Sequence, residues 1–238
     1  MPKPAWKTYQ EEAAALFCSL GMDASTSEVL EGARGKHEID VAVRTRRAGI
    51  AQLWVVECKY WKRRVGKDRV LVLAEVAADL GADRGLLLSE SGFQAGAVRV
   101  ARSSNVTLSS ISDLRENAAE EKAELDAKIA LKRISLMLER VRLLRNPVGY
   151  ARWESRMLPG VDTSVTIPIV GRLSLAQKGL ENALAGILPT LVDARPGGTS
   201  VVLDTLRAVA DAAEAVLMWA EQEIITQEEI AVTEVPGP

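Results

Sequence analysis

The feature that most constrains the fold of this chain is a change in residue pattern near Asp113. Before that point, segments with the two-residue period of a strand alternate with segments that have the helical period. After it, the apolar residues follow helical spacing almost throughout. Helices and strands that alternate along a chain are typical of layered α/β folds. The sequence therefore predicts an α/β domain over 1–115, followed by a mainly helical region over 116–238.

Two of the expected strands have strong signals. Ile39, Val41 and Val43 are predicted to face one side of a strand over 38–44, because they alternate with Glu38, Asp40, Ala42 and Arg44. After a basic turn, residues 53–59 form the second strong strand signal. Weaker signals predict a helix, a short strand, a helix, a strand, a helix and a last strand, which cover residues 5–20, about 26, 67–80, 85–89, 93–103 and 106–109.

The helical half begins with an apolar seam whose residues step by four and three over about three heptads. Two interpretations of this long helix remain open: it packs on its own domain, or it pairs with a second copy or a partner subunit. Asn146 and Pro147 are expected to end the helix. The seam consists of Ala123, Ala127, Ala130, Ile134, Met137, Val141 and Leu144.

The rest of the C-terminal half is predicted to contain two more helices, over 173–188 and 200–224. Before them, residues 165–169 are expected to be extended, with Pro168 limiting any strand to a sheet edge. The segment 195–200 is expected to form a turn with a Ser or Thr helix cap. The last dozen residues are polar and are expected to fray.

Composition excludes several classes of protein. No stretch approaches the roughly 18 apolar residues of a membrane helix, and the start of the chain lacks a signal-peptide pattern, so a soluble, cytoplasmic protein without membrane contact is expected. The two cysteines, Cys18 and Cys58, are expected to be small core residues. Because His37 is the single histidine, multi-histidine metal sites are excluded, and any metal must be held by carboxylates.

Charge is distributed unevenly although the chain holds 30 Lys and Arg against 32 Asp and Glu. Residues 36–69 contain ten basic and four acidic residues, whereas residues 151–238 contain six basic and twelve acidic residues. The basic segment suits a polyanion such as a nucleic acid, and the acidic segment does not.

Three charged residues of the two strong strands suggest a reactive site. Glu57 and Lys59 lie two residues apart on one strand and therefore share a face. Asp40 joins them if the strand over 38–44 pairs alongside in matching register. Two carboxylates together with water and phosphate oxygens suit Mg²⁺, for which Mn²⁺ is expected to substitute. The lysine would then hold or deprotonate an attacking water and stabilise charge at the phosphate.

At these residues the sequence resembles the PD-(D/E)xK nucleases, and among them the Mrr-type restriction endonuclease domain. The resemblance covers residues from about 5 to 115. It implies a restriction-endonuclease-like three-layer core in which helices flank a mixed sheet. The segments that carry it are Gly35-Lys-His-Glu-Ile-Asp40-Val-Ala-Val43, Trp54-Val-Val-Glu57-Cys-Lys59-Tyr-Trp, Val65-Gly-Lys67 and Gly85-Leu-Leu-Leu-Ser-Glu-Ser-Gly-Phe93-Gln-Ala-Gly-Ala97.

The resemblance also implies roles for particular residues. Asp40 and Glu57 would bind Mg²⁺, the backbone carbonyl of Cys58 would be a further ligand, and Lys59 would act on the water. The family often places another acidic or amide residue on the first helix after an aromatic residue. Here Tyr9 precedes Gln10, so Gln10 is the expected fourth site residue, with Glu11 and Glu12 as alternatives.

Basic residues directly follow the Lys59 strand, where they could grip DNA phosphates without reading bases. Tyr60 and Trp61 lie among them, either as stacking platforms or as core residues. His37 precedes the Asp40 strand and either touches substrate or is a loop histidine without a partner. The expected DNA-binding residues are Lys62, Arg63, Arg64, Lys67 and Arg69.

The sequence thus favours a Mg²⁺-dependent DNA endonuclease of the restriction or defence type. The alternative is a catalytically silent module that binds nucleic acid or serves as a scaffold in a larger defence or repair complex. The acidic helical half and the isoelectric point near 5.7 support this alternative, because both are unusual for a free-standing DNA-binding protein.

Overall fold

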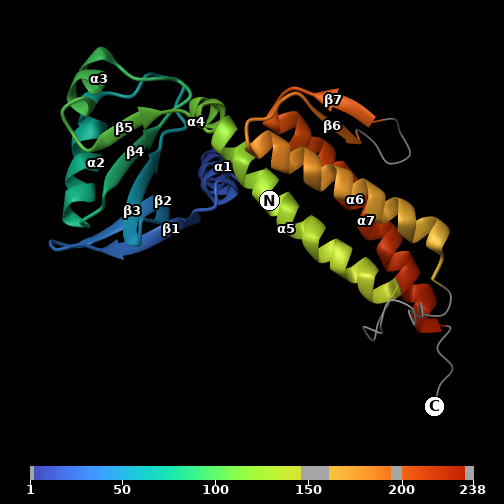
Figure 1. Ribbon diagram of the computed structural model, residues 1–238. Helices are drawn as coiled ribbons and strands as arrows, with labels where there is room; N and C mark the ends of the chain where they lie inside the picture. The colour runs from blue at the N-terminus through green and yellow to red at the C-terminus, as the bar shows by residue number, and fades with distance from the viewer. Residues whose placement is uncertain (1–2, 146–160, 194–199, 234–238) are drawn as a thin grey trace. The chain divides into compact units, whose positions relative to one another are not determined.

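A computed structural model describes residues 3–145, 161–193 and 200–233 (Figure 1). The chain divides into two compact units, Met1–Ala119 and Glu120–Pro238. The expected boundary at residue 115 lies inside a short helix, α4 (Ile111–Asn117), which belongs to the first unit.

The first unit is built around a five-stranded mixed sheet of order β1-β2-β3-β4-β5. The first three strands pair antiparallel, and β3, β4 and β5 pair parallel. Helices flank this sheet, so the predicted α/β fold is confirmed. The elements before α4 are α1 (Ala5–Ser19), β1 (Asp23–Glu31), β2 (Lys36–Arg47), β3 (Ile50–Cys58), α2 (Lys67–Asp79), β4 (Arg84–Leu88), α3 (Ala95–Ala101) and β5 (Val106–Ser109).

Two apolar layers hold the helices on opposite faces of the sheet (Figure 1). On one face, Tyr9 and Phe17 of α1 and Ile111 of α4 pack on alternate residues of β2, β3 and β4. On the other face, α2 and α3 cover the remaining residues of the same strands, with Leu73 and Leu87 among the buried side chains. The central strands are therefore buried on both sides, as their short apolar runs indicate.

The strand β2 is irregular at Asp40, which the sequence did not predict. Val41 and Val43 pack on the α1 face as expected, but Ile39 packs with the α2 face, so the prediction that all three share a side is wrong. Ser27 lies opposite Asp40 in the β1–β2 ladder, falls outside its paired register and has φ 54°. The left-handed backbone of Ser27 interrupts the regular β1–β2 pairing at the position where the side-chain alternation of β2 breaks down.

The second unit contains three long helices and a short hairpin. The helices are α5 (Ala119–Arg145), α6 (Thr163–Leu184) and α7 (Leu206–Thr233). The strands β6 (Thr190–Asp193) and β7 (Ser200–Leu203) pair antiparallel. All seven seam residues of α5 are buried, and most of them pack in one core with α6 and α7. Of the two interpretations of this helix, packing on its own domain is the one seen.

Ion pairs add a second connection between α5 and α7. Arg133 contacts Glu214 and Glu221, and Arg140 contacts Glu221 and Glu228. The arginines of α5 and the glutamates of α7 are each spaced seven residues apart, and the later arginine contacts the later glutamates. The two helices therefore run parallel. Because these side chains are a third to nearly a half exposed, each pair contributes little by itself, and the ladder chiefly favours one alignment of the helices.

Several expectations for the C-terminal half are wrong. Residues 165–169 are helical rather than extended, with Pro168 inside the first two turns of α6. Asp162 caps this helix by accepting from the Ser164 N–H, and helical-period burial continues through Ile169, so packing outweighs the donor that proline removes. The expected helix over 200–224 is a strand followed by α7, which continues to Thr233. Asn146, Pro147 and the turn over 195–199 lie outside the described residues.

The expectations for the cysteines and for membrane contact have different outcomes. Cys58 is buried as predicted, but Cys18 is exposed, because it follows Phe17 on the solvent side of α1. Within the described residues, no helix is long and apolar enough to cross a membrane.

Leu87→Ala should lower the free energy of unfolding by about 2–5 kcal/mol, because the fully buried side chain leaves a cavity between the sheet and α2. Leu71→Ala is the matched control on an exposed α2 position and should change it by at most about 0.5 kcal/mol. Urea denaturation followed by circular dichroism measures both changes. Equal effects of the two substitutions would contradict the assignment of Leu87 to the core.

Candidate active site

The candidate site lies where β2 separates from β3. The last residue pair between these strands is Val41 with Val56. Beyond it, β2 runs with β1 alone, whereas β3 continues alongside β4 to the pair of Cys58 with Leu88. Asp40 is the first β2 residue beyond this separation. Its Oδ2 accepts a hydrogen bond of 2.8 Å from the Cys58 N–H, which fixes the carboxylate against the end of β3.

Glu57 and Lys59 share one face, as their spacing predicts. Glu57 pairs in register with Leu87, whose side chain belongs to the α2 face. Lys59 lies one residue beyond β3, and its N–H donates to the Leu88 carbonyl over 2.8 Å. The Lys59 ammonium forms an ion pair with the Glu57 carboxylate. Lys59 is therefore largely buried and paired with one of the two acidic residues.

Gln10 is the residue of the first helix that reaches this site. Its amide Nε2 donates to Asp40 Oδ1 over 2.7 Å, and the residue is 6% exposed. Glu11 instead pairs with Lys3, and Glu12 lies 3.8 Å from Arg115. Of the three alternatives, only Gln10 is brought to Asp40. Its Oε1 is buried without a hydrogen-bond partner among the described residues, so an acceptor remains available beside the carboxylate.

Glu90 is a supporting residue that the sequence analysis missed. It follows β4 and accepts hydrogen bonds from the Tyr9 hydroxyl at 2.9 Å, the Ile111 N–H at 2.8 Å and the Ser112 hydroxyl at 2.9 Å. It thus ties α1 to the start of α4, and Tyr9 is the neighbour of Gln10. Burial and the Glu90 contact raise the pKa of the Tyr9 phenol. Its position in the sequence could have indicated this role, since Glu90 is the first charged residue after a buried strand.

The electrostatics of the site favour a cation beside Asp40. Burial raises the pKa of the Asp40 carboxyl, and the nearby negative charge of Glu57 raises it further. The Cys58 N–H and the Lys59 ammonium act in the opposite direction. Two carboxylates that disfavour each other's charge in a partly buried place are stabilised by a positive ion between them.

The donor set fits a hard divalent cation. Asp40 has about four lone-pair positions, of which the contacts from Gln10 and Cys58 use two. Glu57 and the Cys58 carbonyl would supply further oxygens, which are the ligands that Mg²⁺ prefers. The described residues contain no cluster of three or more His, Cys, Asp and Glu side chains that could hold a metal. Mg²⁺ rarely has an all-protein cage, so two carboxylates completed by water and phosphate oxygens are compatible with it.

The basic segment after Lys59 is exposed but not uniform. Lys62, Arg63, Arg64, Lys67 and Arg69 are all exposed. Trp61 is half-buried against the α2 face, whereas Tyr60 is 58% exposed, with its ring centroid 5.7 Å from that of Tyr9. The expected core role therefore suits Trp61 better than Tyr60.

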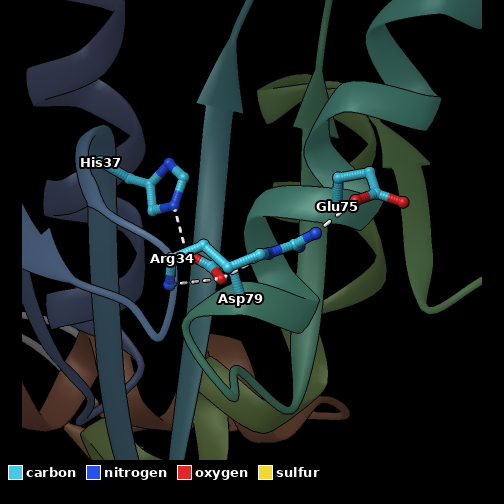
Figure 2. A network of polar contacts seen from close by, with 4 residues as sticks. All are labelled: Arg34, His37, Glu75 and Asp79. Carbon is cyan, nitrogen blue, oxygen red and sulfur yellow. Dashed lines mark hydrogen bonds and ion pairs between the residues drawn. The ribbon is translucent and has the colours of Figure 1, made fainter.

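His37 has a partner, contrary to the expectation of an isolated loop histidine. Its Nε2 lies 2.7 Å from Oδ2 of Asp79, the last residue of α2 (Figure 2). Asp79 Oδ1 accepts from the Arg34 side chain at 2.8 Å and from the Arg34 N–H at 3.0 Å, while Arg34 also reaches Glu75. This network attaches the turn between β1 and β2 to α2, three residues before Asp40. The sequence gives no signal of this contact, because its partners are more than 40 residues apart.

The first unit has the α/β fold of a restriction-endonuclease-like domain, with a mixed sheet between helices. Residues 3–118 match the model of a restriction endonuclease family, the Mrr catalytic domain. No curated protein matches the chain. Among solved structures, the crystal structure of a protein of unknown function, AF1548, is similar with 17% identity and a TM-score of 0.40, covering 92% of this chain and 98% of that one. A likeness at this level carries no functional information.

Asp79→Asn should lower the urea midpoint at pH 7. Contacts from Arg34 and His37 hold the pKa of the Asp79 carboxyl below its usual range, so the charged form is stabilised by folding. That contribution is present above the ordinary carboxyl pKa of about 4 and is lost as the pH falls through the lower, folded-state value. The difference from the unmodified protein should therefore shrink at acidic pH. Asp68→Asn, on an exposed position of the same helix, is the control, and a pH-independent difference would contradict this account.

Proposed function

We propose that the N-terminal domain is a Mg²⁺-dependent DNA endonuclease that hydrolyses phosphodiester bonds. The observation that carries this proposal is the convergence of Asp40, Glu57 and Lys59 at the end of the β2–β3 pairing, with Gln10 bonded to Asp40. The match of residues 3–118 to a restriction endonuclease family supports a nuclease of this type and a DNA substrate.

In this proposal Asp40, Glu57 and the Cys58 carbonyl hold the cation. When bound, Mg²⁺ would polarise a phosphate oxygen and favour ionisation of a water. Asp40 is oriented for this task from two sides, because Gln10 and the Cys58 N–H each fix one of its oxygens. Hydrogen bonds to metal-binding carboxylates fix the orientation of the carboxylates, and their removal lowers metal affinity or activity.

Lys59 has two tasks. Its ammonium pairs with Glu57 in the free protein and lies at the same sheet edge as Asp40. With DNA bound, it would orient the water for in-line attack and stabilise negative charge on the phosphate. The ammonium has no lone pair with which to accept the proton of the water, so that proton would pass to bulk solvent.

A second candidate is a module that binds nucleic acid without cleaving it. One observation favours it: the Lys59–Glu57 ion pair already neutralises the two groups that chemistry would require. The same DNA-binding face would then serve to recruit a larger complex. Binding without metal-dependent turnover distinguishes this candidate from the nuclease.

The nuclease predicts metal-dependent nicking or linearisation of supercoiled plasmid in Mg²⁺ or Mn²⁺, with no reaction in EDTA. Asp40→Asn should abolish cleavage because it removes a carboxylate from the cation site. Lys59→Ala should reduce the rate by about 100-fold or more, since it removes the group that acts on the water. Gel analysis of methylated and unmethylated plasmid measures both effects.

Lys7→Ala is the control for these substitutions, because Lys7 is an exposed lysine on the outer side of α1. It should cleave like the unmodified protein. Undiminished cleavage by Lys59→Ala in Mg²⁺ would exclude the proposed site. A folded protein that binds DNA but never cuts it would support the second candidate.

Gln10→Ala should lower the cleavage rate by about 10- to 100-fold, because Asp40 loses one of the two bonds that orient it. Raising the Mg²⁺ concentration should recover part of the loss. Glu11→Ala and Glu12→Ala, on neighbouring positions without contact to Asp40, should leave the rate unchanged. The proposed role of Gln10 in orienting Asp40 is contradicted if either control loses as much activity as Gln10→Ala.

A further inference from the structure

Three cations surround the ring of Trp61. The Lys59 Nζ lies 5.6 Å from the centroid of the ring, the Arg63 Cζ 5.4 Å and the Arg69 Cζ 5.5 Å. Each distance is within the roughly 6 Å over which a cation is attracted to an aromatic face. The three side chains come from the end of β3, the following turn and the first turn of α2. One indole therefore gathers cations from three separate places in the fold.

The ring itself is held by the fold. The Trp61 carbonyl accepts a hydrogen bond from the Ser91 hydroxyl, and the indole packs against the apolar core under α2. The backbone beyond it is also fixed, since the Val65 N–H donates to the Gly92 carbonyl over 3.0 Å. Trp61 thus provides a rigid surface, whereas Arg63 and Arg69 are exposed and depend on that surface for their position.

The three positive charges are only partly compensated within the described part of the chain. Lys59 pairs with Glu57, and Arg69 lies 3.3 Å from the largely exposed Asp68. No carboxylate among the described residues pairs with Arg63. Like charges held close together repel each other, and the attraction to one ring offsets this only in part. An anionic ligand would remove the repulsion.

The arrangement also lies next to the candidate site. Glu57 and Arg69 line the same cavity of about 220 Å³ between β2, β3 and α2. Lys59 belongs both to the cation cluster and to the set formed with Asp40 and Glu57. An anion that contacts Arg63 and Arg69 would therefore lie beside Lys59, which pairs with Glu57 of the candidate site.

We propose that Trp61 is a positioning residue that holds Arg63 and Arg69 beside Lys59, so that together they bind one DNA backbone phosphate adjacent to the scissile one. This inference rests on the proposed function, since it takes DNA as the ligand. It divides the exposed basic residues into two groups. Arg63 and Arg69 bind at a fixed place, whereas Lys62, Arg64 and Lys67, which contact no ring among the described residues, contribute only general attraction to the polyanion.

The test is DNA binding by the full chain in EDTA, where cleavage does not interfere, with a fluorescent duplex at several salt concentrations. Arg63→Lys and Arg69→Lys keep the charge but lose the planar group that stacks on the indole. Each should weaken binding by about two- to fivefold without changing the salt dependence. Arg64→Lys is the matched comparison in the same turn: it also keeps its charge, but Arg64 contacts no ring among the described residues, so this change should weaken binding less than Arg63→Lys does.

A double-mutant cycle identifies the part played by the ring. Trp61→Leu removes it, and Trp61→Phe keeps an aromatic group and much of the packing should the leucine variant not fold. Arg63→Ala should be non-additive with either change by about threefold, because both disrupt one contact. Lys62→Ala, its equally charged neighbour, should be additive with both.

The outcomes separate this inference from the proposed function. Non-additive effects of the Trp61 and Arg63 substitutions, in a protein that binds but never cuts DNA, support the proposed phosphate-binding site and contradict the proposed nuclease activity. Metal-dependent cleavage combined with equal effects at Arg63 and Arg64, or with additive cycles, overturns the role of Trp61 and leaves the nuclease standing. A folded protein without affinity for DNA contradicts both.

Discussion

The separation of β2 from β3 at Asp40 is the constraint on which the rest of the site depends. A strand that stayed paired on both sides would hold its backbone groups in ladders and its side chains in the two apolar layers. At Asp40 the ladder to β3 ends, so a carboxylate can lie at the sheet edge and take a hydrogen bond from the Cys58 N–H. The backbone of β3 thereby positions an acidic side chain of β2.

Both flanking layers support this place. From the α1 side, Gln10 holds the second oxygen of Asp40, and Glu90 fixes the helix through Tyr9. From the α2 side, the Asp79 network holds the part of β2 that has left β3. Asp79 ends α2, where the helix dipole disfavours a carboxylate, so the donors around it offset an unfavourable position. Polar contacts replace the missing strand pairing.

Much of this domain is predictable from sequence because strand periodicity indicates which side chains share a face wherever the strand is regular, although it fails at Ile39. Glu57 and Lys59 meet for that reason, and the mixed sheet flanked by helices agrees with the alternation of patterns. Gln10 could not be separated from Glu11 and Glu12, because a small helix rotation decides which one faces inward. Contacts such as His37 with Asp79 depend on chain reversal between distant segments, which no local pattern encodes.

The C-terminal half was harder to predict for a different reason. Pro168 favours an extended segment, but tertiary packing makes it part of a helix. The strand β7 has only four residues, which is too short for a clear two-residue period. Helical periodicity itself was dependable: the seam of α5 is buried where its spacing places it. Periodicity identifies the apolar side of a helix, but it does not say whether the covering surface belongs to the same chain.

The covered seam of α5 limits how this protein can assemble. Its heptad positions and the seven-residue charge ladder of Arg133 and Arg140 are both satisfied by helices of the same chain. In coiled coils these are the two features that choose a partner and its alignment. Here both features are satisfied within one chain, so a second copy could bind that face only if the helical unit opened. Any association that leaves the unit folded must use a different surface.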